Sequence, residues 1–329
     1  MNAVTQVPVE TIEDALSPYQ LGELIRFWPA VNGIENSNYF VQLRQTQRVR
    51  EYVLTIMEQS AYSGDHYFAL MQILDQAGLP VAPPIPDAAG NLKVEVNQKP
   101  AMLAHRLSGQ HIYNPTDQQI AAIGRFLARL HNAATIEHNS LETIAHHPRD
   151  LQWVQNNIDF CRGKIAYADF SVLQQAAKIV DSLHSREDLT QLPCGVIHGD
   201  LFRDNVLFNS AGLSGVLDFH HASFGLLVFD LAVVANDWCN DSTGVMSSER
   251  TTLLLKAYHQ IRPLTATELW LFPMFSLYAA LTFWLSRLVK TIEAKHAAVG
   301  RTKNPNEFRK IVVHQLAQQY YVDSRLLEF

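Results

Sequence analysis

Hydrophobic residues in the first third of the chain form short runs that are typical of half-buried strands. Such runs occupy 40–43, 52–57 and 101–105, and Val, Leu, Ile and aromatic residues dominate them. An apolar segment at 9–15 is expected to form a short helix, and 63–77 a second one that stops at Gly-Leu-Pro. The N-terminal third is therefore predicted to be rich in β-strands.

Helical spacing takes over after residue 110. A capping box at Thr116 and Gln119 precedes apolar residues that recur every three or four positions. The exception is a predicted β-hairpin, in which the turn residues 209–212 join 206–208 to 215–219. The fold class is α+β, with a small β-rich N-terminal lobe at 1–105, a hinge near 104–110 and a large, mainly helical lobe at 106–329.

The segment 269–289 is apolar over a length that could cross a bilayer of ~30 Å. It contains Pro273 and Arg287, and the capping box Thr265-x-x-Glu268 precedes it. A buried helix or helix pair in the large lobe is therefore expected, and no membrane partner.

Composition and charge exclude several classes of protein. The 329 residues are 47% hydrophobic and 18% charged, which is ordinary for a globular protein with two domains. The formal net charge of −6 and the lack of a basic stripe argue against a nucleic-acid partner. Three widely spaced cysteines without a CxxC pair indicate reduced thiols, and residues 1–13 lack the apolar core of a secretory signal. We therefore expect a cytoplasmic protein.

The candidate chemistry lies in His198-Gly-Asp200-Leu-Phe-Arg-Asp-Asn205 and in Asp218, which follows the second strand of the predicted hairpin. Phosphoryl transfer from ATP needs a carboxylate that orients the hydroxyl and accepts its proton, and oxygen ligands that hold Mg²⁺ against the phosphates. A loop of the form H-x-D-x-x-x-x-N turns both the Asp and the Asn toward one cleft, and a second Asp completes the metal site.

Asp200 is accordingly the candidate base, Asn205 and Asp218 are candidate Mg²⁺ ligands, and His198 is expected to brace the loop through hydrogen bonds. Any one of these residues alone would be explained better as a turn or cap residue. Their joint occurrence in a strand–loop–strand pattern indicates a kinase that acts on a small molecule.

The stretches 195–208 and 213–219, which contain these residues, resemble the aminoglycoside-phosphotransferase/choline-kinase superfamily. Three further stretches, 33–40, 52–58 and 229–239, are similar to the homoserine kinases of this fold. The resemblance implies a protein-kinase-like fold of two lobes with ATP and Mg²⁺ as cofactors. It also implies phosphorylation of L-homoserine to O-phospho-L-homoserine, a step toward threonine, with Asp200 as the base.

The resemblance also implies where ATP binds. Backbone amides of the loop 32–38 are expected at the phosphates, and backbone groups of the hinge at the adenine. By position, the ATP-binding candidates are Gly33, Asn36, Ser37, Asn38, Thr55, Leu103 and His105.

One departure concerns the lysine that protein kinases carry in their third strand. Thr55 follows Val53-Leu54 where that lysine is expected, and 63–77 contains no Glu to pair with it. A threonine at this place fits the homoserine-kinase branch and not the superfamily at large.

The acceptor site is the least defined part of the sequence. An amino acid presents an ammonium and a carboxylate, so an acid and a cationic or amide donor are needed. The candidates for substrate contact are Arg203, His220, Asp237 and Trp238. Arg287 is a further candidate, although a structural pairing explains it better, and Asp230 is expected to stabilise the loop, as a helix N-cap would.

Two alternatives stay open. The first is a kinase for another small alcohol of the choline, methylthioribose or aminoglycoside type. The aromatic cage or acidic cleft that choline or aminoglycosides would favour is not evident after Asp218. The second is a catalytically silent nucleotide-binding protein, and the missing lysine is the feature that supports it. The oligomeric state is left open.

Overall fold

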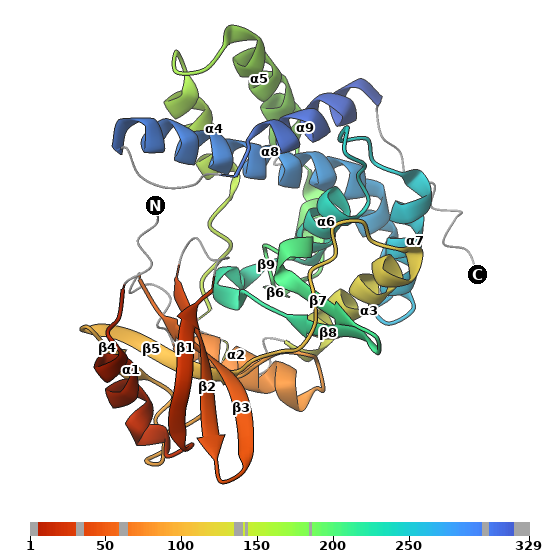
Figure 1. The fold of residues 1–329 in the computed structure, drawn as a ribbon. Coiled ribbons are helices and arrows are strands. Elements are labelled where there is room, and N and C mark those ends of the chain that lie inside the picture. The colour runs from red at the N-terminus through yellow and green to blue at the C-terminus, as the bar shows by residue number, and fades with distance from the viewer. Residues whose placement is uncertain are drawn as a thin grey trace.

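A five-stranded sheet and a larger helical part make up the fold (Figure 1). The computed structural model describes residues 6–30, 36–58, 65–134, 141, 144–183, 186–297 and 303–318. The elements of the first part are α1 (Val9–Leu16), a 3₁₀ helix (Ser17–Tyr19), β1 (Glu23–Pro29), β2 (Ser37–Gln45), β3 (Arg48–Ile56), α2 (Asp65–Gln76), β4 (Val94–Val96) and β5 (Lys99–His105). The strands are antiparallel in the order β1-β2-β3-β5-β4.

The two faces of this sheet differ in what covers them. Alternate side chains of β2 and β3, such as Val41 and Leu54, are buried in a hydrophobic cluster that includes Ile12 of α1. The intervening residues, Phe40 and Val53 among them, lie on the opposite face and are half-buried. In β5, the side chains of Ala101 and Leu103 face α1, and Met102 between them points to the opposite face. Met102 packs with α2 in the hydrophobic cluster of the larger part. The second face is therefore turned toward α2 and the larger part.

Helices and two small two-stranded sheets form the larger part. Its elements are α3 (Asp117–Ala133), α4 (Leu151–Cys161), α5 (Tyr167–Asp181), β6 (Cys194–Ile197), β7 (Val206–Asn209), β8 (Gly212–Val216), β9 (Ser223–Leu226), α6 (Leu227–Trp238), α7 (Ser248–His259), α8 (Ala266–Ala297) and α9 (Asn306–Gln318), with 3₁₀ helices at Glu187–Gln191, Arg203–Asn205 and Phe219–His221. Strand β6 pairs with β9, and β7 pairs with β8. The α+β class and the capping box at Thr116 are confirmed.

Helix α8 contains the apolar segment 269–289 identified in the sequence analysis. It is one continuous helix with Pro273 inside it, so the expected alternative of a helix pair does not apply. Thr265 and Glu268 cap it reciprocally, at 2.9 Å and 3.1 Å. It is long and apolar enough to cross a membrane, but 72% of its apolar window is buried inside the protein. The helix is therefore part of the core.

Several boundaries differ from the sequence prediction, and the second hairpin strand, β8, also begins three residues before the predicted start at 215. The second hairpin strand ends at Val216 and not at Phe219, because Asp218 adopts a left-handed backbone conformation (φ 63°) that ends the strand. The second helix begins at Asp65, and Ser63 lies outside the described residues. Strand β5 ends at His105, while the division into lobes at 105/106 stays a prediction.

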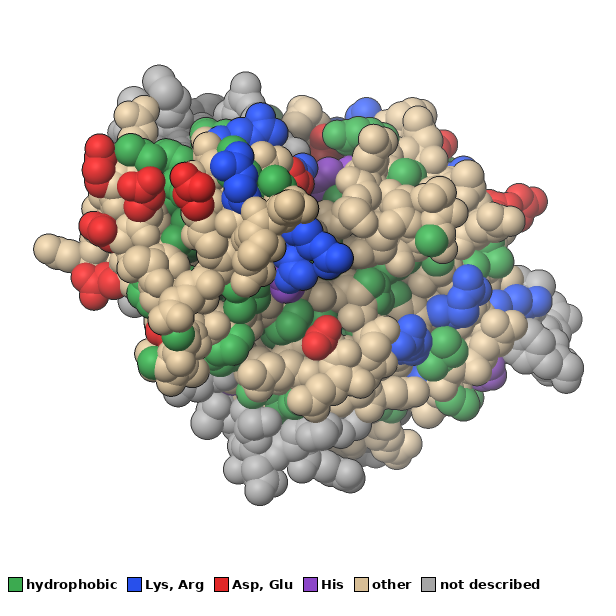
Figure 2. Space-filling view, turned by 60° about the horizontal axis from the view of Figure 1, so that its bottom comes forward, with side chains coloured by type: hydrophobic (Ala, Val, Ile, Leu, Met, Phe, Trp, Pro, Cys, Tyr) green, Lys and Arg blue, Asp and Glu red, His purple; other side chains and the backbone are tan. Residues whose placement is uncertain are grey.

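Charged side chains form separate small groups on the face that Figure 2 shows. Acidic side chains gather at its left edge, on the side where α1 lies in Figure 1, and α1 exposes Glu10, Glu13 and Asp14. Lys and Arg side chains occur in clusters at the centre and on the right. The described part of this face therefore carries charges of both signs rather than one continuous basic surface.

Candidate active site

The loop 198–205 connects β6 to β7 and carries most of the candidate residues. Pairing of Val206 with Val216 in the β7–β8 hairpin brings both ends of the hairpin to this loop. Next to that pair, the Leu217 amide donates to the Asn205 carbonyl at 2.9 Å. The antiparallel pairing therefore places Asn205 beside the chain that leads to Asp218, although they are 13 residues apart.

The side chain of Asn205 is hydrogen-bonded to Asp200. Its Nδ2 donates to the Asp200 carbonyl at 2.8 Å and to Asp200 Oδ2 at 3.2 Å. Burial raises the pKa of Asp200 to about 6, the charges of His221, Arg149 and Lys303 lower it, and Asp218 raises it further. Asp200 is thus a partly desolvated carboxylate with cations and a second carboxylate nearby.

His198 is completely buried and holds the loop from both sides. Its Nδ1 accepts from the Asp200 amide at 3.3 Å, which requires that this nitrogen carries no proton. Its Nε2 then donates to the Leu217 carbonyl at 3.0 Å. Burial lowers the pKa of His198, which keeps the ring neutral and this tautomer in place. These bonds support the proposed bracing role.

Asp230 of α6 fastens the start of the same loop. Its buried carboxylate accepts from the amides of His198 (2.7 Å) and Gly199 (2.9 Å) and contacts His131 Nε2 at 3.2 Å. Burial would raise the pKa of Asp230, but the bond to His131 and the other hydrogen bonds outweigh it and hold the pKa low. The expected loop-stabilising position is observed, but Asp230 is not a helix N-cap, because Leu226 occupies that position in α6.

Asp218 precedes the 3₁₀ helix Phe219–His221 with φ 63° and ψ 55°, and its side chain is exposed. A residue other than glycine in this conformation is uncommon and is often found at functional sites. The charge of Asp218 raises the pKa of both Asp200 and Tyr67, so it lies near the loop and near α2.

The residues present fit a divalent cation. Because Asn205 Nδ2 is used by Asp200, Oδ1 is the atom of that amide that can bind a metal, and Asp218 offers a carboxylate. Both are hard oxygen donors of the kind that Mg²⁺ prefers, and at kinase sites phosphate oxygens and water complete its shell. Within the described residues no group of three or more His, Cys, Asp or Glu side chains forms a further metal site.

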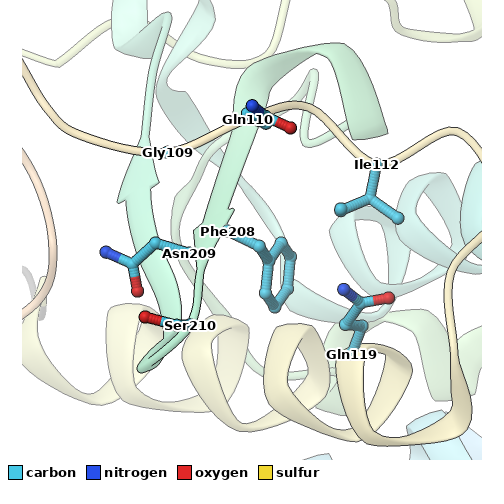
Figure 3. A pocket seen from close by; sticks show the side chains of 7 residues that line it. All are labelled: Gly109, Gln110, Ile112, Gln119, Phe208, Asn209 and Ser210. Atoms are coloured by element: carbon cyan, nitrogen blue, oxygen red, sulfur yellow. The ribbon is translucent and has the colours of Figure 1, made fainter.

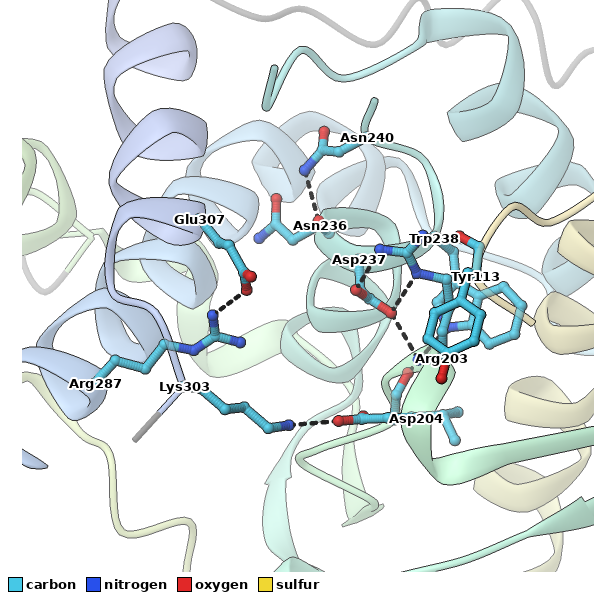
Figure 4. A network of polar contacts seen from close by, with 11 residues as sticks. Tyr113, Arg203, Asp204, Asn236, Asp237, Trp238, Asn240, Arg287, Lys303 and Glu307 are labelled. Carbon is cyan, nitrogen blue, oxygen red and sulfur yellow. Dashed lines mark hydrogen bonds and ion pairs between the residues drawn. The ribbon is translucent and has the colours of Figure 1, made fainter. Parts of the chain in front are cut away.

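Two of the expected substrate contacts, Arg203 and Asp237, pair with each other (Figure 4). The guanidinium binds both carboxylate oxygens at 3.1 Å, and the Arg203 amide donates to Asp237 Oδ2 at 2.7 Å. A further bond reaches the carbonyl of Tyr113. This pair ties the loop to α6, and a role in substrate binding stays a prediction for both residues.

The expectation that Trp238 contacts substrate is wrong. Its side chain is completely buried, and Nε1 donates to the Leu201 carbonyl at 3.1 Å. It therefore supports the loop from inside the core. His220 is half-buried and stacks on Tyr67 of α2, with ring centroids 4.8 Å apart, and its substrate contact stays a prediction.

The residues expected at the phosphates lie on opposite faces of the sheet. Ser37 donates to Glu58, which also pairs with Lys99 and whose amide donates to Asn36. By strand alternation Ser37 is on the α1 face, so this cluster does not face the larger part.

Asn38 and Thr55 lie on the other face, where Thr55 Oγ1 donates to Asn38 Oδ1 at 2.7 Å. They face the larger part together, and Gly33 lies outside the described residues. Asn38 and Thr55 are therefore the candidates in this group whose side chains are on the side of the loop 198–205.

The two hinge candidates also differ. The Leu103 side chain is buried in the cluster under α1, and its carbonyl accepts from the Ile85 amide at 2.8 Å, so its side chain does not face the larger part and a backbone contact with adenine stays a prediction. His105 is exposed at the end of β5 and stacks on Tyr52 at 5.1 Å. A contact with adenine stays a prediction for His105 as well.

A cavity of about 500 Å³ opens beside the segment that follows the hinge (Figure 3). It is lined by Gly109, Gln110, Ile112, Gln119, Phe208, Asn209 and Ser210. These residues surround the turn of the β7–β8 hairpin, whereas Asn205 and Asp218 lie at its opposite end. The cavity is therefore separate from the loop 198–205.

Sequence reasoning missed two cations that act on Asp200, Arg149 and Lys303. Arg149 lies two residues before the start of α4, and Lys303 lies three residues before the start of α9. No motif surrounds either residue, so no local signal could have indicated that they lie near Asp200, which is 51 and 103 positions away.

A profile described as the phosphotransferase enzyme family matches residues 28–264. The homoserine kinase of Methylobacillus flagellatus is 35% identical over 321 residues, which cover 96% of each chain. That of Polaromonas naphthalenivorans is 33% identical over 322 residues, which cover 97% of this chain and 99% of the relative. The similarity to both relatives thus extends over nearly their whole length.

Solved structures with the same fold include a spectinomycin phosphotransferase in complex with ADP and spectinomycin. It has a TM-score of 0.71 at 12% identity, with 96% of this chain and 99% of that chain covered. An amicoumacin kinase in complex with AMP-PNP and Ca²⁺ has a TM-score of 0.67 at 15% identity, with 94% and 92% covered. The predicted protein-kinase-like fold of two lobes is confirmed.

Proposed function

This chain belongs to the phosphotransferase enzyme family, and from that premise we propose that it transfers the γ-phosphoryl group of ATP to the hydroxyl of L-homoserine. The observation that carries phosphoryl transfer is the hydrogen-bonded pair of Asp200 and Asn205 on one loop beside Asp218. The full-length similarity to homoserine kinases supports the choice of acceptor.

Asp200 acts as the base in this proposal. The acceptor oxygen forms a bond to the γ-phosphorus while the bond from that phosphorus to the β–γ bridging oxygen breaks, and the hydroxyl proton passes to the Asp200 carboxylate. The amide of Asn205, bonded to Oδ2, orients this carboxylate. A free alcohol is a poor nucleophile at neutral pH, so positioning must contribute much of the rate.

Asn205 Oδ1 and the Asp218 carboxylate would hold Mg²⁺. When bound, the metal neutralises charge on the phosphate oxygens. The hydrogen bond from the Leu217 amide to the Asn205 carbonyl, which holds the residue before Asp218 next to Asn205, supports this assignment.

The face of the sheet that bears Asn38 and Thr55 is proposed to cover the nucleotide, with the adenine near His105. Thr55 cannot replace the cation of a kinase lysine, but its hydroxyl fixes the orientation of the Asn38 amide. With Oδ1 turned to Thr55, Nδ2 is the group of Asn38 that can donate to a phosphate oxygen. Lys99 lies in the cluster on the opposite face and does not take over this role.

Replacing Asn38 by Asp should raise the KM for ATP about tenfold or more, because a carboxylate would then face the phosphates where an amide donor had been. Steady-state kinetics with varied ATP at saturating acceptor measure this change. Asn97→Asp, in the exposed turn between β4 and β5, introduces the same charge far from this face and serves as the control. An unchanged KM for ATP in Asn38→Asp would exclude Asn38 from the phosphate site.

ADP release by the purified protein with Mg²⁺-ATP and a panel of alcohols tests the proposed function. We expect turnover with L-homoserine and a kcat/KM at least 100-fold higher than with choline, methylthioribose or an aminoglycoside. Such a ratio corresponds to about 2.7 kcal/mol of discrimination. Turnover of one of the other alcohols without turnover of homoserine would show that homoserine is not the acceptor. Nucleotide binding without turnover of any alcohol would favour a catalytically silent nucleotide-binding protein.

The product of this reaction, O-phospho-L-homoserine, lies on the route to threonine, and we place the reaction in the cytoplasm. The reduced state expected of the cysteines supports this location. The structure describes all three as free, and Cys161 and Cys239 are buried.

A further inference from the structure

We infer that the Arg149 guanidinium binds the carboxylate of the acceptor, so that a cationic aromatic cluster beside the loop 198–205 selects an acceptor with an anionic group. This inference rests on the proposed function and deepens it, since it names the residue that recognises one end of homoserine.

Three phenylalanine rings form the aromatic cluster. Phe202, of the loop itself, meets Phe283 of α8 edge to face with ring centroids 4.7 Å apart, and Phe308 of α9 stacks on Phe283 at 5.3 Å. Phe202 stands between Asp200 and Asn205 in the sequence and is 4% exposed. The cluster is therefore a fixed wall that includes part of the loop.

Each ring of the cluster carries a cation. The guanidinium carbon of Arg149 lies 4.4 Å from the Phe283 centroid, and that of Arg287 lies 4.6 Å from the Phe308 centroid. Lys303 Nζ lies 5.4 Å from the Phe202 centroid. Three cationic side chains thus lie against the rings of this wall.

Two of these cations are held by acids of the chain (Figure 4). Lys303 reaches Asp204 at 2.7 Å, and Arg287 pairs with Glu307. In Figure 4 both side chains extend in the same direction, and Lys303 is the one that reaches the loop. The ion pair with Glu307 therefore accounts for Arg287 in this segment without a bound substrate, in agreement with the sequence analysis.

The position of Arg149 is fixed by hydrogen bonds of its own backbone and of the next residue. Its carbonyl accepts from the Tyr278 hydroxyl at 2.6 Å, and the next residue, Asp150, caps α4 through the Trp153 amide at 2.7 Å. The backbone is thereby anchored to α8 and α4, and the guanidinium lies on Phe283 with Nη1 buried. Its charge is one of those that lower the pKa of Asp200, which agrees with a position close to the reacting hydroxyl.

The chemistry of this position suits a carboxylate. A guanidinium presents parallel N–H donors that match two carboxylate oxygens, and stacking on an aromatic ring leaves its edge able to make these bonds. A cationic acceptor such as choline or an aminoglycoside would meet repulsion there. The cluster therefore favours an amino-acid acceptor over the alternatives.

Arg149→Met tests the inference by comparing two ligands that differ only at this end, L-homoserine and L-homoserinol, in which CH₂OH replaces the carboxylate. Binding is measured calorimetrically with AMP-PNP and Mg²⁺ present, and turnover by ADP release. We expect the Kd and KM of homoserine to rise about 30- to 100-fold, as for loss of one partner of a charged pair. The values for homoserinol should change by less than about threefold, and Arg149→Lys should recover part of the loss.

The matched control is Arg162→Met, which removes a guanidinium stacked on Phe170 at the far end of α4. This variant should leave the Kd and KM of both homoserine and homoserinol unchanged. Equal losses for homoserine and homoserinol in Arg149→Met, or no loss for either, would overturn the inference while the proposed function stands. Failure of the wild-type protein to bind or phosphorylate homoserine would instead overturn the proposed function, and wild-type preference for homoserinol would overturn both.

Discussion

Asp200→Asn will lower kcat with L-homoserine by about 10³-fold, within the range that a general base contributes. An amide keeps the shape of the side chain and still accepts a hydrogen bond from Asn205 Nδ2, but it cannot take up the hydroxyl proton. The loss should therefore fall on kcat, because the contacts that bind ATP are unchanged. Single-turnover kinetics and nucleotide binding by calorimetry separate these two quantities.

The control for this substitution is Asp159→Asn, an exposed aspartate of α4 that pairs with Arg162 on the protein surface. It should retain wild-type kcat. Turnover at the wild-type rate in Asp200→Asn would show that another group accepts the proton. A large loss of ATP affinity in place of kcat would assign Asp200 to the metal rather than to the hydroxyl.

Asp230→Ala will reduce the free energy of unfolding by about 3–5 kcal/mol, the cost of removing one partner of a buried charged network. Two amides of the loop, at His198 and Gly199, and the ring of His131 would lose their shared acceptor in the interior. Because two of these groups begin the loop 198–205, kcat should fall together with stability. Urea denaturation measures the first effect, and steady-state kinetics the second.

A milder variant distinguishes a local effect from global unfolding. Asp230→Asn retains one acceptor oxygen, so it should lose less stability, while hydrogen exchange at the His198 and Gly199 amides should still accelerate relative to the wild type. Asp241→Ala, in an exposed turn where the carboxylate accepts from the amides of Thr243 and Val245, is the control. A loss of less than 1 kcal/mol in Asp230→Ala would mean that the loop holds its conformation without this carboxylate.

Local patterns predicted the helices and strands near the site because these elements depend on neighbouring residues. The strands at 40–43 and 52–57, the hairpin turn near 209–212 and the cap of α8 all follow from alternation, turn residues and capping boxes. The strand predicted to reach Phe219 failed for a local reason as well, since a left-handed aspartate is not favoured by its residue type alone.

Contacts between segments that are distant in the chain could not be predicted from the sequence. Its motifs indicated phosphoryl transfer with Asp200, Asn205 and Asp218, because those residue types at that spacing perform it within one loop and hairpin. Tertiary structure decided the partners around them. The Arg203–Asp237 pair, the burial of Trp238 and the position of Arg149 depend on how α4, α6 and α8 pack against the loop. Packing of these helices is a property of the whole core, and no short stretch of residues encodes it.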